Sequence, residues 1–339
     1  MRPSKYEPRP PKTGGGKLKT SAMIASLAAE GMPTKPAPFG HALCDIARER
    51  DDIVGMTADL SKYTDLYVFA EAYPDRFYQM GMAEQVLISA AAGMAREGFT
   101  VFATTYAVFA SRRAYDFIYM AIAEENLNVK IVAALPGLTT GYGPSHQATE
   151  DVAIFRGMPN LTIVDPCDAT DIEQATHAIA EHHGPVYMRL LRGNVANVLD
   201  EYGYQFELGK AKMVRDGNDV LFISTGFMTM RVLEAAKRLQ KDSVDCAVLH
   251  VPTIKPLDTA TIVEAARKSG RLVVVAENHT VVGGLGEGVA RSLLIEGVAP
   301  KFRHIGLPDA FLDAGALPTL HDRYGLSVDA VCASVKSWL

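Results

Sequence analysis

Short apolar runs rich in β-branched residues alternate with helical segments along most of this chain. Five such runs lie at residues 53–58, 99–105, 129–135, 161–164 and 186–191. Segments with helical character lie between them, at residues 84–97, 108–125 and 168–182. Apolar strands that alternate with helices indicate a mostly parallel sheet covered on both faces. The pattern therefore predicts the α/β class, in which ligands bind at the carboxyl ends of the strands.

The pattern also divides the chain into two α/β units, and two domains are the natural expectation for 339 residues. Residues 39–192 form the first unit, residues 193–217 an irregular polar linker, and residues 218–339 the second unit. Residues 1–38 comprise an arm at residues 1–20, which is rich in Pro, Gly, Lys and Arg, and a short helix predicted at 21–30. Two interpretations of the arm remain open, a disordered leader and a segment that lies on a partner chain.

Composition excludes several functional classes. A net charge of −5 argues against a general nucleic-acid-binding protein. The four cysteines lie far apart and form no CxxC pair, which argues against a disulfide framework or a zinc site and fits a reducing cytoplasm. No apolar run approaches the ~20 residues of a membrane span, and the N-terminus lacks the apolar core of a secretory signal. We therefore expect a cytoplasmic protein without a membrane anchor.

Glu84 is the first candidate for chemistry. It lies in the first turn of the helix predicted at 84–97, directly before an apolar run and several small residues, so we expect it to be buried. A buried carboxylate is costly unless it has a partner, which makes Glu84 a candidate for proton chemistry. The alternative is that Glu84 only accepts hydrogen bonds from first-turn amides.

The segment Gly81-Met82-Ala83-Glu84-Gln85 resembles the Gly-hydrophobic-Ala/Arg-Glu-Gln segment of thiamine diphosphate enzymes of the transketolase type. The resemblance extends from about Phe39 to the C-terminus. It implies that residues 39–192 are a pyrimidine-binding domain and residues 218–339 a transketolase C-terminal-like domain. In that family the glutamate hydrogen-bonds N1′ of the cofactor's aminopyrimidine, and the imino tautomer that this contact favours removes the C2 proton of the thiazolium. The resemblance thus gives Glu84 a catalytic, cofactor-binding role.

Two further motifs match the cofactor site of the family. Asp59 follows the first strand in an Ala-Asp-Leu segment, where the family places an aspartate beside the cofactor near the dimer interface. Tyr106 and Phe109 follow the next strand and match the aromatic residues that stack on the pyrimidine ring. The residues alone also permit simpler roles, a helix cap for Asp59 and core packing for the two aromatic side chains.

A Gly- and Pro-rich loop, residues 141–147, presents His146 and is similar to the Gly-Glu-Asp-Gly-Pro-Thr-His-Gln loop of transketolases. The resemblance implies that His146 contacts the donor sugar and moves protons, a task that suits an imidazole. The chain departs from the family here, because Tyr142 stands where a substrate-binding Asp is expected. Leu135-Pro136 likewise replaces a Thr-His pair that binds substrate phosphate. We therefore expect a more apolar substrate pocket, with Tyr142 among its contacts.

Arg192 closes the first unit and resembles a family arginine that binds substrate phosphate, for which a guanidinium is well suited. An interdomain salt bridge is the alternative role. The segment 277–288 is rich in glycine but lacks the spacing of a dinucleotide fingerprint. It looks like the Glu-Asn-His…Gly-Gly-Leu-Gly element of transketolase C-terminal domains, and we expect His279 to have no catalytic role.

The metal-binding half of a thiamine site is missing from the sequence. The family holds the cofactor's diphosphate through Mg²⁺ or Ca²⁺ with a Gly-Asp-Gly motif and a downstream Asn, and this chain has no Gly-Asp-Gly. Asp216-Gly217-Asn218 is the nearest segment and lies in the predicted linker. The sequence therefore predicts no metal ligands in this chain. It predicts instead a split enzyme whose diphosphate-binding subunit is another polypeptide, with an α2β2 assembly.

The resemblance implies transfer of a two-carbon ketol unit from a phosphorylated or otherwise anionic ketose to an aldose or aldehyde. Two alternatives remain. One is the beta subunit of a 2-oxo-acid dehydrogenase, which decarboxylates a 2-oxo acid. The other is a non-catalytic interaction subunit that has kept the fold. Glu84 and the aromatic pair speak against the second alternative, whereas Tyr142 and Leu135 favour it.

Overall fold

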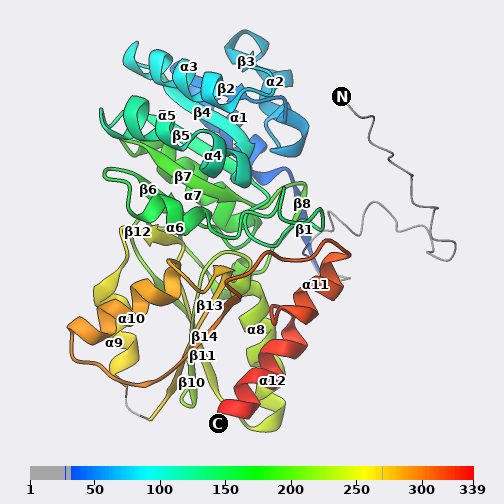
Figure 1. Cartoon of the computed structure of the whole chain (residues 1–339), viewed down its shortest axis with the longest axis vertical. Helices are drawn as coiled ribbons and strands as arrows, with labels where there is room; N and C mark the ends of the chain where they lie inside the picture. Colours follow the sequence, from blue (N-terminus) through cyan, green and yellow to red (C-terminus); the bar gives the residue numbers. More distant parts are fainter. Residues whose placement is uncertain (1–26, 28–31, 269) are drawn as a thin grey trace, which may run out of the picture.

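The computed structural model describes Leu27, residues 32–268 and residues 270–339. The arm at residues 1–20 and the helix predicted at 21–30 lie outside this range, apart from Leu27. Two sheets, one of seven strands and one of five, lie one above the other in the elongated molecule (Figure 1). Both are built mainly from parallel strands and are accompanied by helices, which confirms the predicted α/β class.

The seven-stranded sheet has the order β12-β6-β7-β5-β4-β2-β3. Its strands β2 to β7 run parallel to their neighbours, and only β12 is antiparallel. The bounds are β2 (Ile53–Thr57), β3 (Phe77–Gln79), β4 (Thr100–Tyr106), β5 (Val129–Ala134), β6 (Thr162–Val164), β7 (Val186–Leu190) and β12 (Thr253–Lys255). Every residue of β2, β4, β5 and β7 is buried, as expected for strands covered on both faces.

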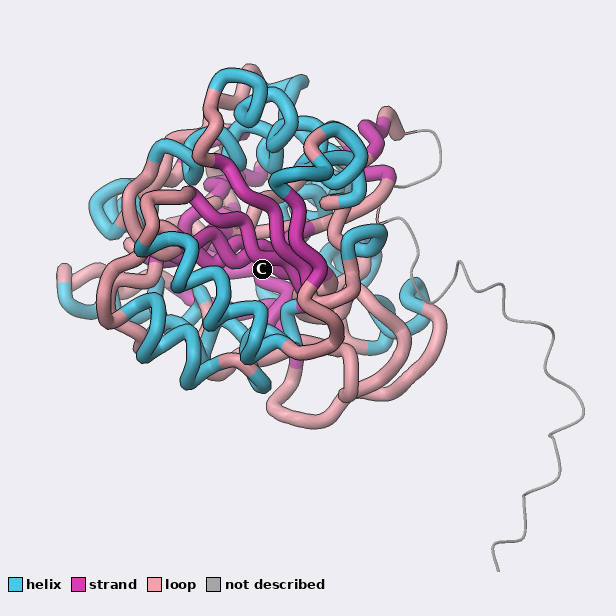
Figure 2. Tube along the Cα trace, turned by 90° about the horizontal axis from the view of Figure 1, so that it is seen from above, coloured by secondary structure: helices cyan, strands magenta, loops and turns pink. Residues whose placement is uncertain are grey.

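Helices flank this sheet on both sides (Figure 2). One group contains α1 and α7, which pack against each other, and a second contains α3, α4 and α5. The helices are α1 (Pro38–Glu49), α2 (Tyr67–Ala72), α3 (Glu84–Arg96), α4 (Ala107–Arg113), α5 (Tyr115–Ile118), α6 (Asp151–Arg156) and α7 (Ala169–Glu181). Short 3₁₀ turns occur at η2 (Ser61–Tyr63) and η3 (Pro74–Arg76), and one π-helical turn at η4 (Tyr119–Ala123).

The five-stranded sheet has the order β14-β13-β10-β11-β9, and only β9 is antiparallel to its neighbour. Its strands are β9 (Lys212–Arg215), β10 (Val220–Ser224), β11 (Cys246–His250), β13 (Leu272–Thr280) and β14 (Lys301–Leu307). Its helices are α8 (Met228–Leu239), α9 (Thr259–Arg267), α10 (Leu285–Ile295), α11 (Leu317–Arg323) and α12 (Val328–Trp338). Two 3₁₀ turns, η5 (Leu199–Tyr202) and η6 (Gln240–Asp242), complete this part.

Several elements differ from those expected. The helix expected at 108–125 is broken into α4, α5 and the π-helical turn η4. The predicted linker contains two strands, β8 (Asn194–Ala196), which pairs with β1 (Thr34–Pro36), and β9. Strand β12 lies within the range predicted for the second unit but extends the first sheet by pairing with β6. A three-residue strand is too short to show a period of two, so its sequence carried no signal.

Buried polar contacts join the two units. Arg189 at the end of β7 is 1 % exposed, and its guanidinium pairs with Asp151 and Asp165 while donating to the carbonyl of Asn278 on β13. The Asn278 side chain in turn accepts from the backbone N–H of Leu138 and donates to a carbonyl in the same loop. The units are therefore fixed to each other directly behind the loop that carries His146.

Candidate functional site

Four of the predicted site positions follow the carboxyl ends of neighbouring parallel strands. Asp59 comes after β2, Tyr106 ends β4, Leu135 follows β5, and Arg192 follows β7. Adjacent parallel strands end at the same edge of a sheet, so these residues gather along one edge. The backbone at Asp59 and Leu135 has positive φ values of 59° each, a conformation that non-glycine residues rarely adopt and that is enriched at functional sites.

Glu84 is the first residue of α3 and is 3 % exposed, as expected. Its two carboxylate oxygens lie 3.2 and 3.4 Å from Nη1 of Arg113, the last residue of α4. The guanidinium of Arg113 also lies over the ring of Phe109, 3.9 Å from its centroid. The buried carboxylate thus has a cationic partner, and that cation connects Glu84 to the predicted aromatic residues.

Aromatic rings surround His146. The His146 ring lies 5.5 Å from Phe109 and 6.3 Å from Tyr106 in edge-on arrangements, and 5.5 Å from Tyr142. Tyr106 and Phe109 lie 5.7 Å apart. The structure therefore brings four predicted residues into one cluster, and Arg113 links this cluster to Glu84.

The environment of His146 favours a neutral ring. Burial lowers the pKa of His146 below its ordinary value, and the positive charge of Arg113 lowers it further. Ser145 Oγ lies 2.9 Å from His146 Nδ1 and can fix the orientation of the ring. A neutral imidazole can accept a proton, which is what a general base at this position requires.

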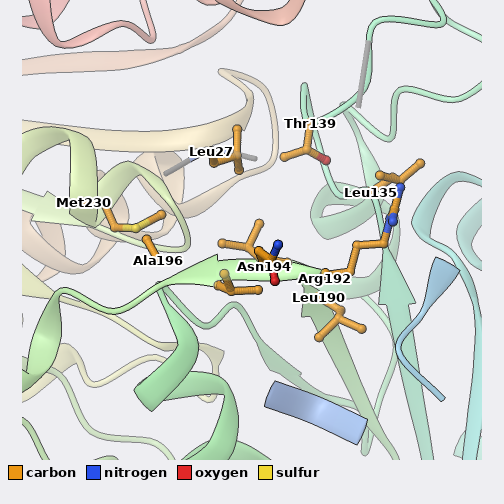
Figure 3. A pocket seen from close by; sticks show the side chains of 11 residues that line it. Leu27, Leu135, Thr139, Leu190, Arg192, Asn194, Ala196 and Met230 are labelled. Atoms are coloured by element: carbon orange, nitrogen blue, oxygen red, sulfur yellow. The ribbon is translucent and has the colours of Figure 1, made fainter. Parts of the chain in front are cut away.

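Arg192 borders an interdomain pocket of about 240 Å³. Figure 3 shows Leu135 and Arg192 at one end of this pocket and Met230, from α8, at the other. Apart from Arg192, Thr139 and Asn194, side chains that line the pocket are apolar, and Gly193 adds backbone. The Nε atom of Arg192 is buried and has no hydrogen-bond partner among the described residues, and its guanidinium lies 5.4 Å from the ring centroid of Tyr63.

Arg192 and the His146 cluster are electrostatically coupled through Tyr106. Burial raises the pKa of the Tyr106 hydroxyl, and the Arg192 guanidinium opposes that shift. Asp59 bonds to Gln79 rather than to the cluster: its backbone N–H and its carboxylate contact the Gln79 side chain at 2.8 and 3.0 Å. Within the described part of the chain, no hydrogen bond or ion pair joins Asp59 to the other predicted residues, so its position beside a cofactor stays a prediction.

Sequence reasoning missed the two arginines of α4. Arg112 and Arg113 follow Phe109 by three and four positions, so on a helix they lie on the same side as its ring. That spacing was a usable signal once α4 was placed directly after β4. Arg113 contacts Glu84, whereas Arg112 contacts the loop of His146. Among the described residues, no group of three or more His, Cys, Asp or Glu side chains could hold a metal ion.

Comparison with known proteins gives the family. Models of the transketolase pyrimidine-binding domain and the transketolase C-terminal domain match residues 34–197 and 209–331. The chain belongs to the transketolase family. It is 68 % identical to an uncharacterized transketolase family protein of Sinorhizobium fredii, and the match covers 100 % of this chain and 99 % of the relative.

Two other transketolase relatives are informative. A 6-deoxy-6-sulfo-D-fructose transketolase subunit of a Clostridium species is 37 % identical, over 85 % of this chain and 89 % of the relative. A split gene transketolase, solved as an inactive beta4 tetramer, is 39 % identical with a TM-score of 0.81, and the match covers 91 % of this chain and 98 % of that one. The family uses thiamine diphosphate. In the part of this chain that the structure describes, no helix has both the length and the hydropathy needed to cross a membrane.

Proposed function

We propose that this chain is the pyrimidine-binding and C-terminal subunit of a split, thiamine diphosphate-dependent transketolase, with domains at residues 39–192 and 218–339. It transfers a two-carbon ketol unit from an anionic ketose to an aldose or aldehyde. The observation that carries the proposal is the buried Glu84 carboxylate, linked through Arg113 to the aromatic cluster around His146. The four cysteines are free, in keeping with the cytoplasm as its compartment.

The residues present fit the aminopyrimidine half of the cofactor. A buried carboxylate can accept from a ring nitrogen, and the flat faces of Phe109 and Tyr106 can stack on a heteroaromatic ring. When bound, thiamine diphosphate supplies the nucleophilic carbon to which the two-carbon unit is transferred. In this chemistry Glu84 holds the proton that lies between its carboxylate and the pyrimidine ring nitrogen. Asp59 lies at the subunit boundary in this proposal.

The same residues do not fit the diphosphate half. Mg²⁺ and Ca²⁺ prefer several oxygen ligands. The described residues contain no group of three or more His, Cys, Asp or Glu side chains that could hold such an ion. We therefore assign the Mg²⁺ or Ca²⁺ ion and the diphosphate to a partner subunit, in an α2β2 assembly whose active site lies between the chains. The likeness to a split gene transketolase supports a division of the enzyme between two polypeptides.

Substrate recognition falls to His146, Arg192 and Tyr142. His146 accepts or returns the proton of a donor hydroxyl, because burial and Arg113 keep its ring neutral. The buried Nε of Arg192 donates to the anionic end of the substrate. Tyr142 and Leu135 stand where the family has an aspartate and a Thr-His pair, so they make the rest of the substrate pocket less polar. The relative named for a sulfonated fructose supports an anionic ketose as the donor.

The test is a donor and acceptor screen with the chain reconstituted with a diphosphate-binding partner subunit. We expect ketol transfer from phosphorylated or sulfonated ketoses, with Arg192→Met raising KM for the anionic donor more than for its uncharged analogue. Decarboxylation of 2-oxo acids without ketol transfer would favour a 2-oxo-acid dehydrogenase subunit. If the assembled pair bound no thiamine diphosphate, the non-catalytic alternative would hold.

A further inference from the structure

Arg112 makes three contacts with the segment that carries His146. Its Nη1 donates to the carbonyl of Pro144 at 2.9 Å, and its Nη2 donates to the carbonyl of Gln147 at 3.1 Å. Its Nε pairs with the carboxylate of Glu150. The guanidinium therefore bridges the two carbonyls on either side of the Ser145-His146 dipeptide.

The second unit holds the same loop from another direction. The Gln147 side-chain amide donates to the carbonyl of Asp313 at 3.1 Å, and the backbone N–H of Gly315 donates to the carbonyl of Gly141 at 2.9 Å. His321 contacts the carbonyl of Leu138 at 2.8 Å. These contacts hold the two ends of the loop against the second unit, but none of them joins the loop to α4, the helix that carries Phe109.

Arg112 supplies that relation because it lies on the same helix as Phe109, three residues further on. One helix thus carries both the ring that faces His146 and the guanidinium that bonds the carbonyls on either side of the Ser145-His146 dipeptide. We propose that Arg112 is a positioning residue, which sets the distance and orientation of His146 relative to Phe109 and the reacting substrate. This inference rests on the proposed function of His146 as a proton-transfer group.

An arginine suits this task better than a lysine. Its planar guanidinium carries five N–H groups in a fixed fork and can bond two carbonyls and a carboxylate at once. A lysine ammonium at this position can satisfy the carbonyls but fixes no plane. Misplacement of a catalytic group by about 1 Å can reduce the rate on the order of 10²-fold.

The experiment compares Arg112→Gln and Arg112→Lys with the wild-type pair and with Arg156→Gln. Arg156 is a matched control, since its guanidinium also donates to two loop carbonyls, those of Gly283 and Gly284, but that loop carries no predicted catalytic group. We expect Arg112→Gln to lower kcat about 10- to 100-fold, with cofactor affinity within twofold of wild type. Arg112→Lys should recover part of the loss, and Arg156→Gln should keep wild-type kcat.

The His146 ring gives a second measurement that needs no turnover. A loosened loop exposes the ring to water and moves it from Arg113, so the pKa of His146 should rise in Arg112→Gln toward its ordinary value. As the pH is lowered, the ring then becomes protonated at a higher pH than in wild type. The acid limb of the kcat profile therefore shifts to higher pH. Among the described residues, the charged and titratable side chains that contact His146 or its loop, or act on its charge, are Arg112, Arg113, Tyr106, Tyr142 and Glu150.

The outcomes are distinguishable. Unchanged kcat and an unchanged pKa of His146, measured by NMR in Arg112→Gln, would overturn the positioning role. So would a loss of kcat that Arg156→Gln reproduces, because the effect would then be one of general stability. If the wild-type pair transfers no ketol unit, the proposed function fails, while the NMR titration still decides whether Arg112 holds the His146 loop.

Discussion

Replacing Glu84 with glutamine tests the catalytic half of the account. Glutamine keeps the length and shape of the side chain but carries no negative charge and cannot serve as the acceptor that holds a proton. The change is confined to one residue at the start of α3, whose side chain is 4 % exposed. We therefore expect the fold to survive and proton transfer to the cofactor to fail.

The structure predicts a small effect of this substitution on stability and a large effect on rate. The partner of Glu84 is half-exposed, since 50 % of the Arg113 side chain is accessible, so loss of the pair should cost about 1 kcal/mol of stability. With an unfolding entropy of roughly 2.1 cal/mol/K per residue, that corresponds to a fall in Tm of about 1–2 °C. Loss of a proton-transfer group costs on the order of 10²–10⁴ in rate, or about 3–5 kcal/mol in activation free energy.

The assay is deuterium exchange at C2 of the bound cofactor, followed by NMR in the reconstituted pair, alongside thermal unfolding of each variant. Glu97→Gln is the matched control, because Glu97 is exposed and lies at the other end of the same helix. We expect exchange to fall by at least 10²-fold in Glu84→Gln and to stay unchanged in Glu97→Gln. Exchange at the wild-type rate in Glu84→Gln would refute the role of this carboxylate.

Two further predictions concern charged groups near the site. Arg113 pairs with Glu84 and lies over the ring of Phe109, and both groups are predicted to hold the cofactor ring. Because the cofactor must compete with Arg113 for these groups, Arg113→Ala should tighten thiamine diphosphate binding by the pair about fivefold, equivalent to ~1 kcal/mol. Weaker binding by calorimetry would mean that Arg113 supports Glu84 instead. Burial raises the pKa of Asp65 to about 6, so its folded form binds a proton more tightly and stability should fall as pH rises from about 4 to 6. Asp65→Asn can still accept from the N–H of Gly193 but does not titrate, so the Tm of this variant should lose that slope. The Tm of wild type minus that of the variant should therefore fall as pH rises through this range, and a constant difference would contradict the assignment.

The sequence predicts the sheet centres well and their margins poorly. Strands β2, β4, β5 and β7 are mostly apolar and β-branched, with at most one charged residue each, and the structure places each within about one residue of its expected position. Strand β14 carries lysine, arginine and histidine among its apolar residues and gave no such run. The helix expected over 108–125 breaks after Arg113, where Ala114 adopts a non-helical conformation that no Pro or Gly announces.

The candidate site is predictable to the extent that its residues follow strand ends. Tyr106 and Phe109 were found in this way, Glu84 from its place at the start of a helix that precedes an apolar run, and His146 from its loop. Arg112 and Arg113 escaped because an arginine at the end of a short helix is most often a solvent-exposed charge, and only tertiary contacts reveal its partners. The role of each site residue in catalysis stays a prediction that the experiments above address.

The most direct test of the central claim is calorimetric titration of thiamine diphosphate with Mg²⁺ into this chain alone and into the chain assembled with its diphosphate-binding partner. The account predicts saturable binding by the pair and none by the isolated chain at the same concentrations, since the described residues offer no metal site. Binding of the coenzyme by the isolated chain, accompanied by turnover of sugars, would contradict it.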